Sequence, residues 1–218
     1  MSSHPPLDWP DYKSTRLRHP SQLRPLTATE TELTAPRLGD RPLGEHDHDL
    51  TVHGDGEPLG ERIIVHGRVL EPDGRPLADT LVEVWQCNAA GRYRHQGDRH
   101  PAPLDENFTG LGRCSTGADG SFEFVTIKPG AYPWGNHHNA WRPAHIHFSV
   151  FGRAFAQRLV TQMYFPGDPL FPQDPIFNAA GADRDRLVAA FDLDRTRPEW
   201  ALAYRWDIVL TGTPFEDA

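Results

Sequence analysis

Short apolar runs separated by turn-forming residues restrict the fold of this chain more than any other feature of its sequence. The first run, residues 63–70, is rich in β-branched residues and is followed by Asp73-Gly74, a pair typical of tight turns between strands. Further runs with strand character lie at residues 80–86, 121–126, 145–151, 158–165 and 204–210. With 19 Gly and 21 Pro residues to form turns, this pattern predicts an all-β fold, a β-sandwich of mostly antiparallel strands with long loops.

Two segments depart from the strand pattern. Residues 1–60 contain many Pro, Gly, Asp and His residues and show no sustained strand or helix period, as in a disordered segment or an arm that wraps another surface. One short helix is expected at residues 183–190, where Asp183 can cap the first backbone amides. We therefore expect an irregular N-terminal arm (1–60) followed by a β-sandwich domain (61–218).

Composition excludes several classes of protein. With 218 residues, of which 38% are hydrophobic and 24% charged, the chain can bury the core of one large domain. A formal net charge of −8 argues against a nucleic-acid-binding surface, and no apolar run approaches the ~18–20 residues that span a bilayer. The N-terminus lacks the basic start and apolar stretch of a signal peptide, so a cytoplasmic protein is expected. Two cysteines, Cys87 and Cys114, do not form a disulfide scaffold, and Cys87 is expected to be a packed residue.

His145 and His147 form a His-x-His pair at the start of a run with strand character. Because side chains alternate between the faces of a strand, residues two apart project side by side. Two imidazoles on one face can bind one metal ion. Histidine also has many structural uses, so the pair by itself leaves both interpretations open.

Two tyrosines in loop segments are candidate partners of this pair. Tyr132 lies in a stretch stiffened by prolines on both sides, and Tyr93 follows the run at 80–86. If both reached the metal, the donors would be two phenolates and two neutral imidazoles, and hard anionic oxygens favour Fe(III) over Zn(II), Cu(I) or Ca(II). Each tyrosine taken singly can equally be a half-buried residue with its hydroxyl bonded to backbone, and spacing alone does not make the four residues a site.

Three motifs occur in order and carry a family resemblance: residues 91–95 (Gly-Arg-Tyr-Arg-His), 128–134 (Lys-Pro-Gly-Ala-Tyr-Pro-Trp) and 141–147 (Trp-Arg-Pro-Ala-His-Ile-His). Together they resemble the intradiol ring-cleaving dioxygenases and, among these, the iron-carrying β subunits of the protocatechuate 3,4-dioxygenases. The resemblance extends over about residues 8–210. The catechol and hydroxyquinol 1,2-dioxygenases share the motifs but carry a helical N-terminal segment, where this chain has a Pro-rich arm.

The resemblance implies one Fe(III) per chain and a set of site residues. Its ligands would be Tyr93, Tyr132, His145 and His147, with Tyr132 and His147 axial and a hydroxide completing the shell. Arg142 and Gln162 would lie beside the substrate ring and act in catalysis together with Tyr132. The substrate-binding residues would be Tyr12, Trp134, Arg142, Gln162 and Ile176.

The resemblance also implies an activity and partners. The enzyme would cleave protocatechuate with O2 to 3-carboxy-cis,cis-muconate, in aromatic catabolism through the β-ketoadipate pathway. A homologous α subunit is expected within a higher-order hetero-oligomer, with the arm 1–60 packed on that partner and on the active site. Neither nucleic acid nor a membrane is an expected partner.

Other interpretations stay open at this stage. The substrate can be another substituted catechol, such as sulfocatechol, catechol or hydroxyquinol. Residues 67–78 locally resemble a non-catalytic transthyretin-like binding module, although that pattern builds only two strands and a turn. The non-catalytic α subunit shares the fold but lacks the full ligand set, which this chain has. For His46 and His48 we expect a structural role, and we assign no metal to the loop pair His137 and His138.

Overall fold

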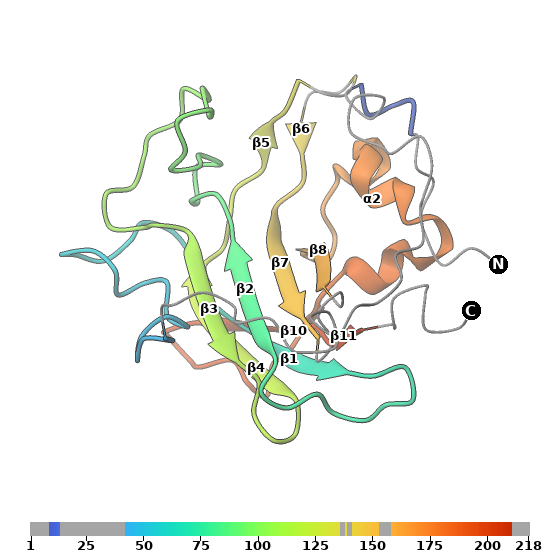
Figure 1. Ribbon diagram of the computed structural model, residues 1–218. Coiled ribbons are helices and arrows are strands. Elements are labelled where there is room, and N and C mark those ends of the chain that lie inside the picture. The colour runs from blue at the N-terminus through green and yellow to red at the C-terminus, as the bar shows by residue number, and fades with distance from the viewer. Residues whose placement is uncertain (1–8, 14–41, 136–137, 139–140, 153–157, 211–218) are drawn as a thin grey trace.

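The computed structural model describes residues 9–13, 42–135, 138, 141–152 and 158–210 of the chain as two β-sheets packed face to face (Figure 1). In one sheet, β1 pairs with β4 on one side and with β10 and then β11 on the other, and β9 pairs with β10. The strand bounds are Arg62–Leu70 (β1), Ser121–Ile127 (β4), Ala190–Phe191 (β9), Leu202–Arg205 (β10) and Ile208–Val209 (β11).

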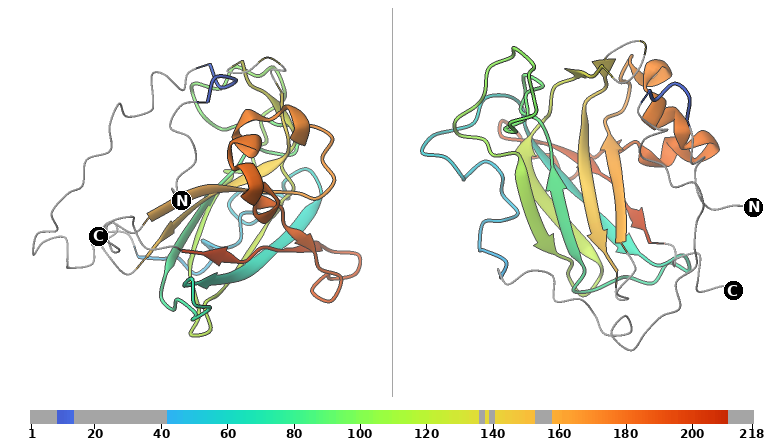
Figure 2. Two further views of the ribbon diagram at one scale, coloured as in Figure 1. Left: turned by 90° about the vertical axis from the view of Figure 1, so that its right-hand side faces the viewer. Right: turned by 45° about the horizontal axis from the view of Figure 1, so that its top comes forward.

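The second sheet has four antiparallel strands in the order β3-β2-β7-β8, and it lies in front of the first in the right-hand view of Figure 2. A separate two-stranded hairpin, β5 and β6, extends beyond its end. The bounds are Leu81–Trp85 (β2), Leu111–Ser115 (β3), Tyr132–Pro133 (β5), Trp141–Arg142 (β6), His145–Phe151 (β7) and Arg158–Tyr164 (β8).

The core lies between the two sheets and follows the two-residue alternation of their strands. In β7, Ile146, Phe148 and Val150 are buried in the main apolar cluster, each stabilising the fold by about 1.5–3 kcal/mol through burial. Phe122 of β4 meets Phe148 edge-on at a centroid distance of 5.9 Å, which joins the sheets across the core. The residues between them in β7 therefore point to the outer face.

The predicted all-β sandwich is confirmed, and so are the strands at 63–70, 80–86, 121–126, 145–151 and 158–165, to within one residue at each end. Among the named strands of the described residues, all pairs are antiparallel except those of β1 with β10 and β11. Strand β3 and the two-residue strands β5, β6 and β9 were not expected. Strand β3 has the sequence Leu-Gly-Arg-Cys-Ser, which lacks β-branched residues and shows no strand pattern.

The prediction of one continuous strand at 204–210 is wrong, because the chain leaves the sheet between β10 and β11. Trp206 donates its backbone N–H to the His66 carbonyl at 2.8 Å and buries its ring against Phe148. A Cβ on Gly67 would lie 1.9 Å from the Trp206 carbonyl oxygen. This crossing therefore requires glycine at position 67.

The short helix predicted at residues 183–190 is present, but its type, its bounds and its cap differ from the prediction. That region holds a 3₁₀ helix, η2 (Gly181–Leu187), whose N-cap is Ala180, and Asp183 lies in its first turn and pairs with Arg186 at the surface. The segment has no apolar stripe to bury, so packing does not select a longer α-helix. The one α-helix in the described part of the chain is α2 (Pro175–Ala179), preceded by the 3₁₀ helix η1 (Phe171–Gln173). Its start, Asp174 as N-cap and Pro175 in the first turn, is a helix signal that the sequence did contain.

Part of the N-terminal region joins the sandwich. The Leu50 N–H bonds to the Val125 carbonyl of β4, and the Arg113 N–H of β3 bonds to the Asp47 carbonyl, each at 2.8 Å. Leu50 itself is fully buried. Residues 47–50 thus tie the edge strands of the two sheets together. Among the described residues, no helix is long and apolar enough to cross a membrane.

Gly67→Ala should destabilise the fold by about 3 kcal/mol or more, because the new methyl group meets backbone that cannot move without breaking the β10–β11 crossing. Denaturant unfolding followed by circular dichroism measures the change. Gly135→Ala is the matched control, since its Cβ would meet nothing within 4 Å. Equal stability of both variants would contradict this account of the crossing.

Candidate functional site

The site is built on the outer face of the four-stranded sheet, at the start of β7. In the pairing register, His147 lies between Trp85 of β2 and Gln162 of β8, and His145 lies opposite Tyr164 of β8. Residues paired across antiparallel strands share a face, so these side chains form one group on the side away from the core. The two imidazole rings are 4.8 Å apart between centroids. The predicted adjacency of the two histidines is therefore present.

Two loop segments bring the tyrosines over this face. Tyr132 is on β5, paired with Arg142 of β6, and Tyr93 lies in the loop after β2, where its N–H donates to the Asp98 carboxylate at 2.7 Å. The loops touch at Gly91, which has a φ of +77° and whose Cβ would lie 2.3 Å from the Ala131 carbonyl oxygen. Only glycine allows this approach. The Tyr93 and Tyr132 rings then meet edge-on at 5.3 Å.

The four polar tips converge at distances suited to one metal ion. The Tyr93 hydroxyl oxygen is 3.1 Å from His147 Nε2, and the Tyr132 hydroxyl oxygen is 3.4 Å from His145 Nε2. Two donors at about 2.0–2.2 Å from one ion and about 90–110° apart lie about 3.0–3.5 Å from each other. In the described part of the chain, no group of three or more His, Cys, Asp and Glu side chains is placed to hold a metal. The mixed tyrosine–histidine set is therefore the candidate.

Burial keeps both histidines neutral, as metal ligands must be. His145 Nδ1 bonds to the Pro143 carbonyl at 2.7 Å, so this nitrogen carries the proton and the Nε2 lone pair faces the tyrosines. Desolvation, reinforced by the charge of Arg142, lowers the pKa of His145 well below its ordinary value and that of His147 to about 3.

The tyrosines have the opposite shift. Burial raises the pKa of Tyr93 and Tyr132 above the ordinary value, although Arg142 partly counters the increase at Tyr132. Both phenols are therefore protonated at neutral pH in the protein alone. A bound cation of high charge is what would remove their protons, and this matches a trivalent ion.

A largely buried network surrounds Arg142. Its guanidinium donates to Asp174 from Nε (3.2 Å) and Nη2 (2.8 Å), and Nη2 also lies 2.6 Å from Gln162 Oε1 and 2.8 Å from the Tyr164 hydroxyl. Its other end, Nη1, lies 3.1 Å from His145 Nε2 and 3.4 Å from the Tyr132 hydroxyl. Although burial opposes the charge, Tyr164 and Asp174 raise the pKa of Arg142 above its usual value. The arginine is thus permanently charged and aimed at the donor set.

The other residues predicted to bind substrate, Tyr12, Trp134 and Ile176, are linked to Arg142 directly or through one neighbour. The Arg142 guanidinium lies over the Trp134 ring at 5.3 Å, and the Tyr12 ring lies 4.8 Å from Trp134. Ile176 is half-buried on α2, and its N–H donates to Asp174, the partner of Arg142. Trp134 therefore connects the N-terminal segment to the arginine, and Asp174 connects the arginine to α2.

Three neighbours of the donor set were missed from the sequence: Trp85, Tyr164 and Asp174. Trp85 stacks on the His147 ring, with centroids 4.8 Å apart and planes 4° from parallel. It also lines a cavity of about 400 Å³ together with Tyr93, Tyr132 and His147. Asp174 was detectable as a helix cap, whereas Trp85 and Tyr164 become neighbours only through strand register, which no sequence motif reports.

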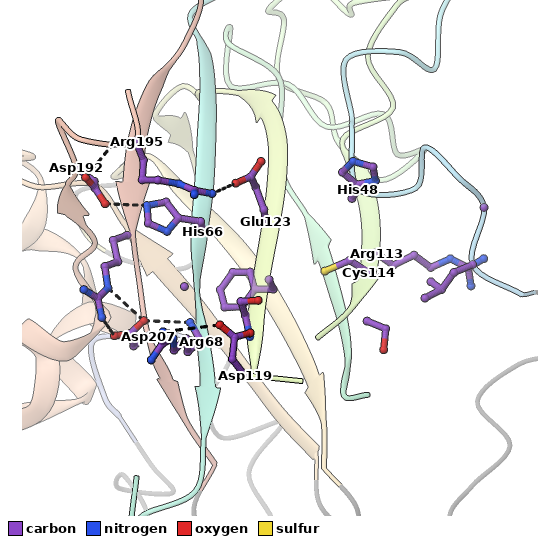
Figure 3. A pocket seen from close by; sticks show the side chains of 17 residues that line it. His48, His66, Arg68, Arg113, Cys114, Asp119, Glu123, Asp192, Arg195 and Asp207 are labelled. Carbon is purple, nitrogen blue, oxygen red and sulfur yellow. Dashed lines mark hydrogen bonds and ion pairs between the residues drawn. The ribbon is translucent and has the colours of Figure 1, made fainter. Parts of the chain in front are cut away.

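A larger cavity, about 890 Å³, lies elsewhere, between the outer side of β1 and β4 and the edge of β3, and none of the four donors lines it (Figure 3). Its ionisable side chains are largely paired with one another. The pairs are His66–Asp192 (3.0 Å), Arg68–Asp119 (3.7 Å), Arg195–Glu123 (2.5 Å) and Arg205–Asp207 (2.6 Å). His48 lies exposed at its rim, His46 and His138 are exposed, and His137 lies outside the described residues. We therefore assign this cavity no chemistry.

Comparison with known proteins identifies relatives along the whole chain. A sequence profile described as "Dioxygenase" matches residues 33–212, and one described as "Protocatechuate 3,4-dioxygenase beta subunit N terminal" matches residues 2–28. The chain is 58% identical to the protocatechuate 3,4-dioxygenase beta chain of Burkholderia cepacia, over 98% of this chain and 94% of that one. It is 32% identical to the protocatechuate 3,4-dioxygenase alpha chain of the same organism, over 70% of this chain and 74% of that one.

More distant relatives share the sandwich. Catechol 1,2-dioxygenase 1 of Acinetobacter lwoffii is 36% identical over 64% of this chain and 45% of that protein. The dioxygenase domain of a carbohydrate-binding fusion protein from Streptomyces sp. SirexAA-E superposes with a TM-score of 0.55 at 28% identity, covering 82% of this chain and 99% of that one. The 3-chlorocatechol 1,2-dioxygenase of Rhodococcus opacus has a TM-score of 0.60 at 24% identity, over 83% and 71% of the two chains, which supports the fold alone.

Neither cysteine should react in the native protein. Burial raises the pKa of both Cys87 and Cys114 to about 12, so only about one thiol in 10⁴ is ionised at pH 8, and the thiolate is the reactive form. Titration with a chromogenic disulfide reagent at pH 8 should label no thiol in native protein and two after unfolding in guanidinium chloride. Rapid labelling of the native chain would contradict the burial described above.

Proposed function

Because the chain belongs to the intradiol ring-cleaving dioxygenases, in the group of the protocatechuate 3,4-dioxygenase β subunits, we propose that it is the iron-carrying subunit of such an enzyme. It binds one Fe(III) and cleaves protocatechuate with O2 to 3-carboxy-cis,cis-muconate. The observation that carries this proposal is the convergence of two tyrosine hydroxyls and two neutral imidazoles beside a buried arginine. The 58% identity to a protocatechuate 3,4-dioxygenase beta chain supports the choice of substrate.

Tyr93, Tyr132, His145 and His147 would hold the ion. Their chemistry fits Fe(III), because phenolate oxygens are hard anionic donors and neutral imidazoles complete the set without excess charge. When bound, the ion supplies the Lewis acidity and electron transfer that make a catechol reactive toward O2. The protein's own groups do the rest: they bind and orient the ring, accept protons and exclude water.

Tyr132 would accept a proton from the catechol. Its hydroxyl lies 3.4 Å from Arg142 Nη1, whose charge stabilises the phenolate before the proton arrives. Arg142 also stabilises negative charge that develops on the substrate ring, since it is charged at every pH of interest. Gln162 contributes a polar amide beside Arg142, and its Oε1 accepts from Arg142 Nη2 and from the Tyr164 hydroxyl.

The pocket walls come from three parts of the chain. Trp134 stacks against Arg142, Tyr12 packs on Trp134, and Lys13 donates to the Gly135 carbonyl at 3.4 Å. These contacts support an N-terminal arm (1–60) that reaches the active site of the sandwich domain (61–218), with Tyr12 and Ile176 among the substrate-binding residues. The arm also packs on a homologous α subunit, a partnership supported by the likeness to both chains of the Burkholderia cepacia enzyme.

The purified complex of this chain with its α partner should be red-brown, because phenolate-to-Fe(III) charge transfer absorbs visible light. Anaerobic addition of protocatechuate should change the spectrum, and an oxygen electrode should record uptake with protocatechuate faster than with catechol, hydroxyquinol or sulfocatechol. Faster uptake with another of these would reassign the substrate. A colourless, iron-free complex that consumes no O2 with any of them would refute the proposal.

Tyr132→Phe should alter the charge-transfer band and lower kcat by roughly 10²–10⁴-fold, the range for loss of a positioned proton acceptor. Visible absorbance and oxygen uptake measure the two effects. Tyr204→Phe is the matched control, because Tyr204 is a buried tyrosine in the core of the other sheet. An unchanged spectrum in Tyr132→Phe would remove this residue from the ligand set.

A further inference from the structure

We propose that Asp174, which none of the site motifs includes, is a positioning residue for the ring-cleaving reaction. It fixes the orientation and offsets the charge of Arg142, and it ties the arginine to the helix that carries Ile176. This inference rests on the function proposed above and names a further residue of the same site.

Asp174 is bonded through both carboxylate oxygens. Oδ1 accepts from Arg142 Nε at 3.2 Å, and Oδ2 accepts from Arg142 Nη2 at 2.8 Å and from the Tyr164 hydroxyl at 3.0 Å. A two-point ion pair of this kind fixes the plane of the guanidinium, which a single bond leaves free to rotate. Fixing that plane directs Nη1 toward the Tyr132 hydroxyl and His145 Nε2. Asp174 thus fixes the orientation of the guanidinium through Nε and Nη2, opposite the Nη1 group that faces Tyr132 and His145.

Charge is the second contribution of Asp174. Arg142 is 1% exposed and Asp174 is 0% exposed, and among the described residues Asp174 is the one carboxylate paired with this arginine. A buried guanidinium without a partner is strongly unfavourable. Because Asp174 pairs with it, the arginine can act on Tyr132 without being an uncompensated buried charge. Removing the carboxylate leaves one uncompensated positive charge beside the donor set.

The same carboxylate also begins helix α2. Oδ1 accepts the Ile176 N–H at 3.2 Å, and Asp174 is the N-cap of Pro175–Ala179. The backbone carbonyl of Asp174 accepts from the Asn178 N–H at 3.0 Å and from its side-chain amide at 2.8 Å. One residue therefore fixes two sides of the proposed pocket, the arginine and the isoleucine wall.

Asp174→Asn separates the pairing with Arg142 from the cap of helix α2. Asparagine has the same shape and caps helices as well as aspartate, so α2 should keep its start while the charge of the pair is lost. We expect the variant complex to fold, with an unfolding temperature lower by roughly 5–15 °C. We expect kcat with protocatechuate to fall about 100-fold, the scale of a misplaced catalytic group. The dissociation constant from anaerobic spectral titration should change less than about fivefold, because Tyr12 and Trp134 are untouched.

Asp105→Asn is the matched control. Asp105 is a buried carboxylate that accepts backbone N–H groups of Leu59 and Asn107 in loops outside the network of Arg142. It should lower the unfolding temperature and leave kcat within about twofold. A merely structural Asp174 would behave in the same way: lower stability with unchanged kcat in Asp174→Asn would overturn the proposal.

Tyr164→Phe tests the positioning role of Asp174 if Asp174→Asn does not fold. It removes one hydroxyl bonded to Asp174 and Arg142 but keeps the ion pair, so kcat should fall about tenfold with an unchanged dissociation constant. An unchanged kcat in that variant would also overturn the proposal. Failure of the proposed function would look different, since the wild-type complex would then consume no O2 with any catechol.

Discussion

The alternation of side chains along β7 is the constraint on which the rest of the site depends. Ile146, Phe148 and Val150 are buried between the sheets, and this burial forces His145 and His147 onto the outer face. A slip of one residue would expose the apolar residues and bury the histidines among them, so the core itself fixes the register. The same pairing sets Trp85, Gln162 and Tyr164 around the two imidazoles. The register of β7 therefore fixes both the packing of the core and the geometry of the site.

Segments outside the four-stranded sheet supply the two tyrosines of the site. Phenol groups have to approach the imidazoles from above the sheet, and they do so where Gly91 lets two loops touch. The resulting pocket is dry enough to keep the histidines neutral and the tyrosines protonated, as the opposite pKa shifts of His147 and Tyr93 indicate. A cation that binds there meets lone pairs already directed at one point, and it supplies the charge needed to ionise the phenols. The protein thus positions the donor atoms, and a bound ion would determine the protonation of the phenols.

The features that follow the two-residue period of the strands could be predicted from the sequence. Periodicity predicted the sandwich and placed His145 beside His147, because a strand period of two is visible in a handful of residues. Periodicity did not predict β3, because Gly112 and Arg113 interrupt the strand pattern there. It predicted one strand through β10 and β11, because the break at Trp206 depends on a contact with Gly67. The roles proposed for Tyr93 and Tyr132 came from family resemblance and not from spacing. Asp174 and Tyr164 reach Arg142 from 32 and 22 residues away along the chain, and no local pattern encodes such contacts.

The buried pair of Arg142 and Asp174 is not explained by stability. Replacing a buried ion pair with apolar residues of the same volume often leaves a fold as stable or stabilises it by about 1–4 kcal/mol, because two desolvated charges seldom recover their hydration through mutual attraction. Here the pair lies at the end of a sheet whose other buried positions are mostly apolar, and one end of its guanidinium faces Tyr132 and His145. A core built for stability alone would place a leucine or methionine there. The proposed reaction would account for this charge, held by two oxygens and neutralised at the same time, because it would need a fixed positive group beside an ionising phenol.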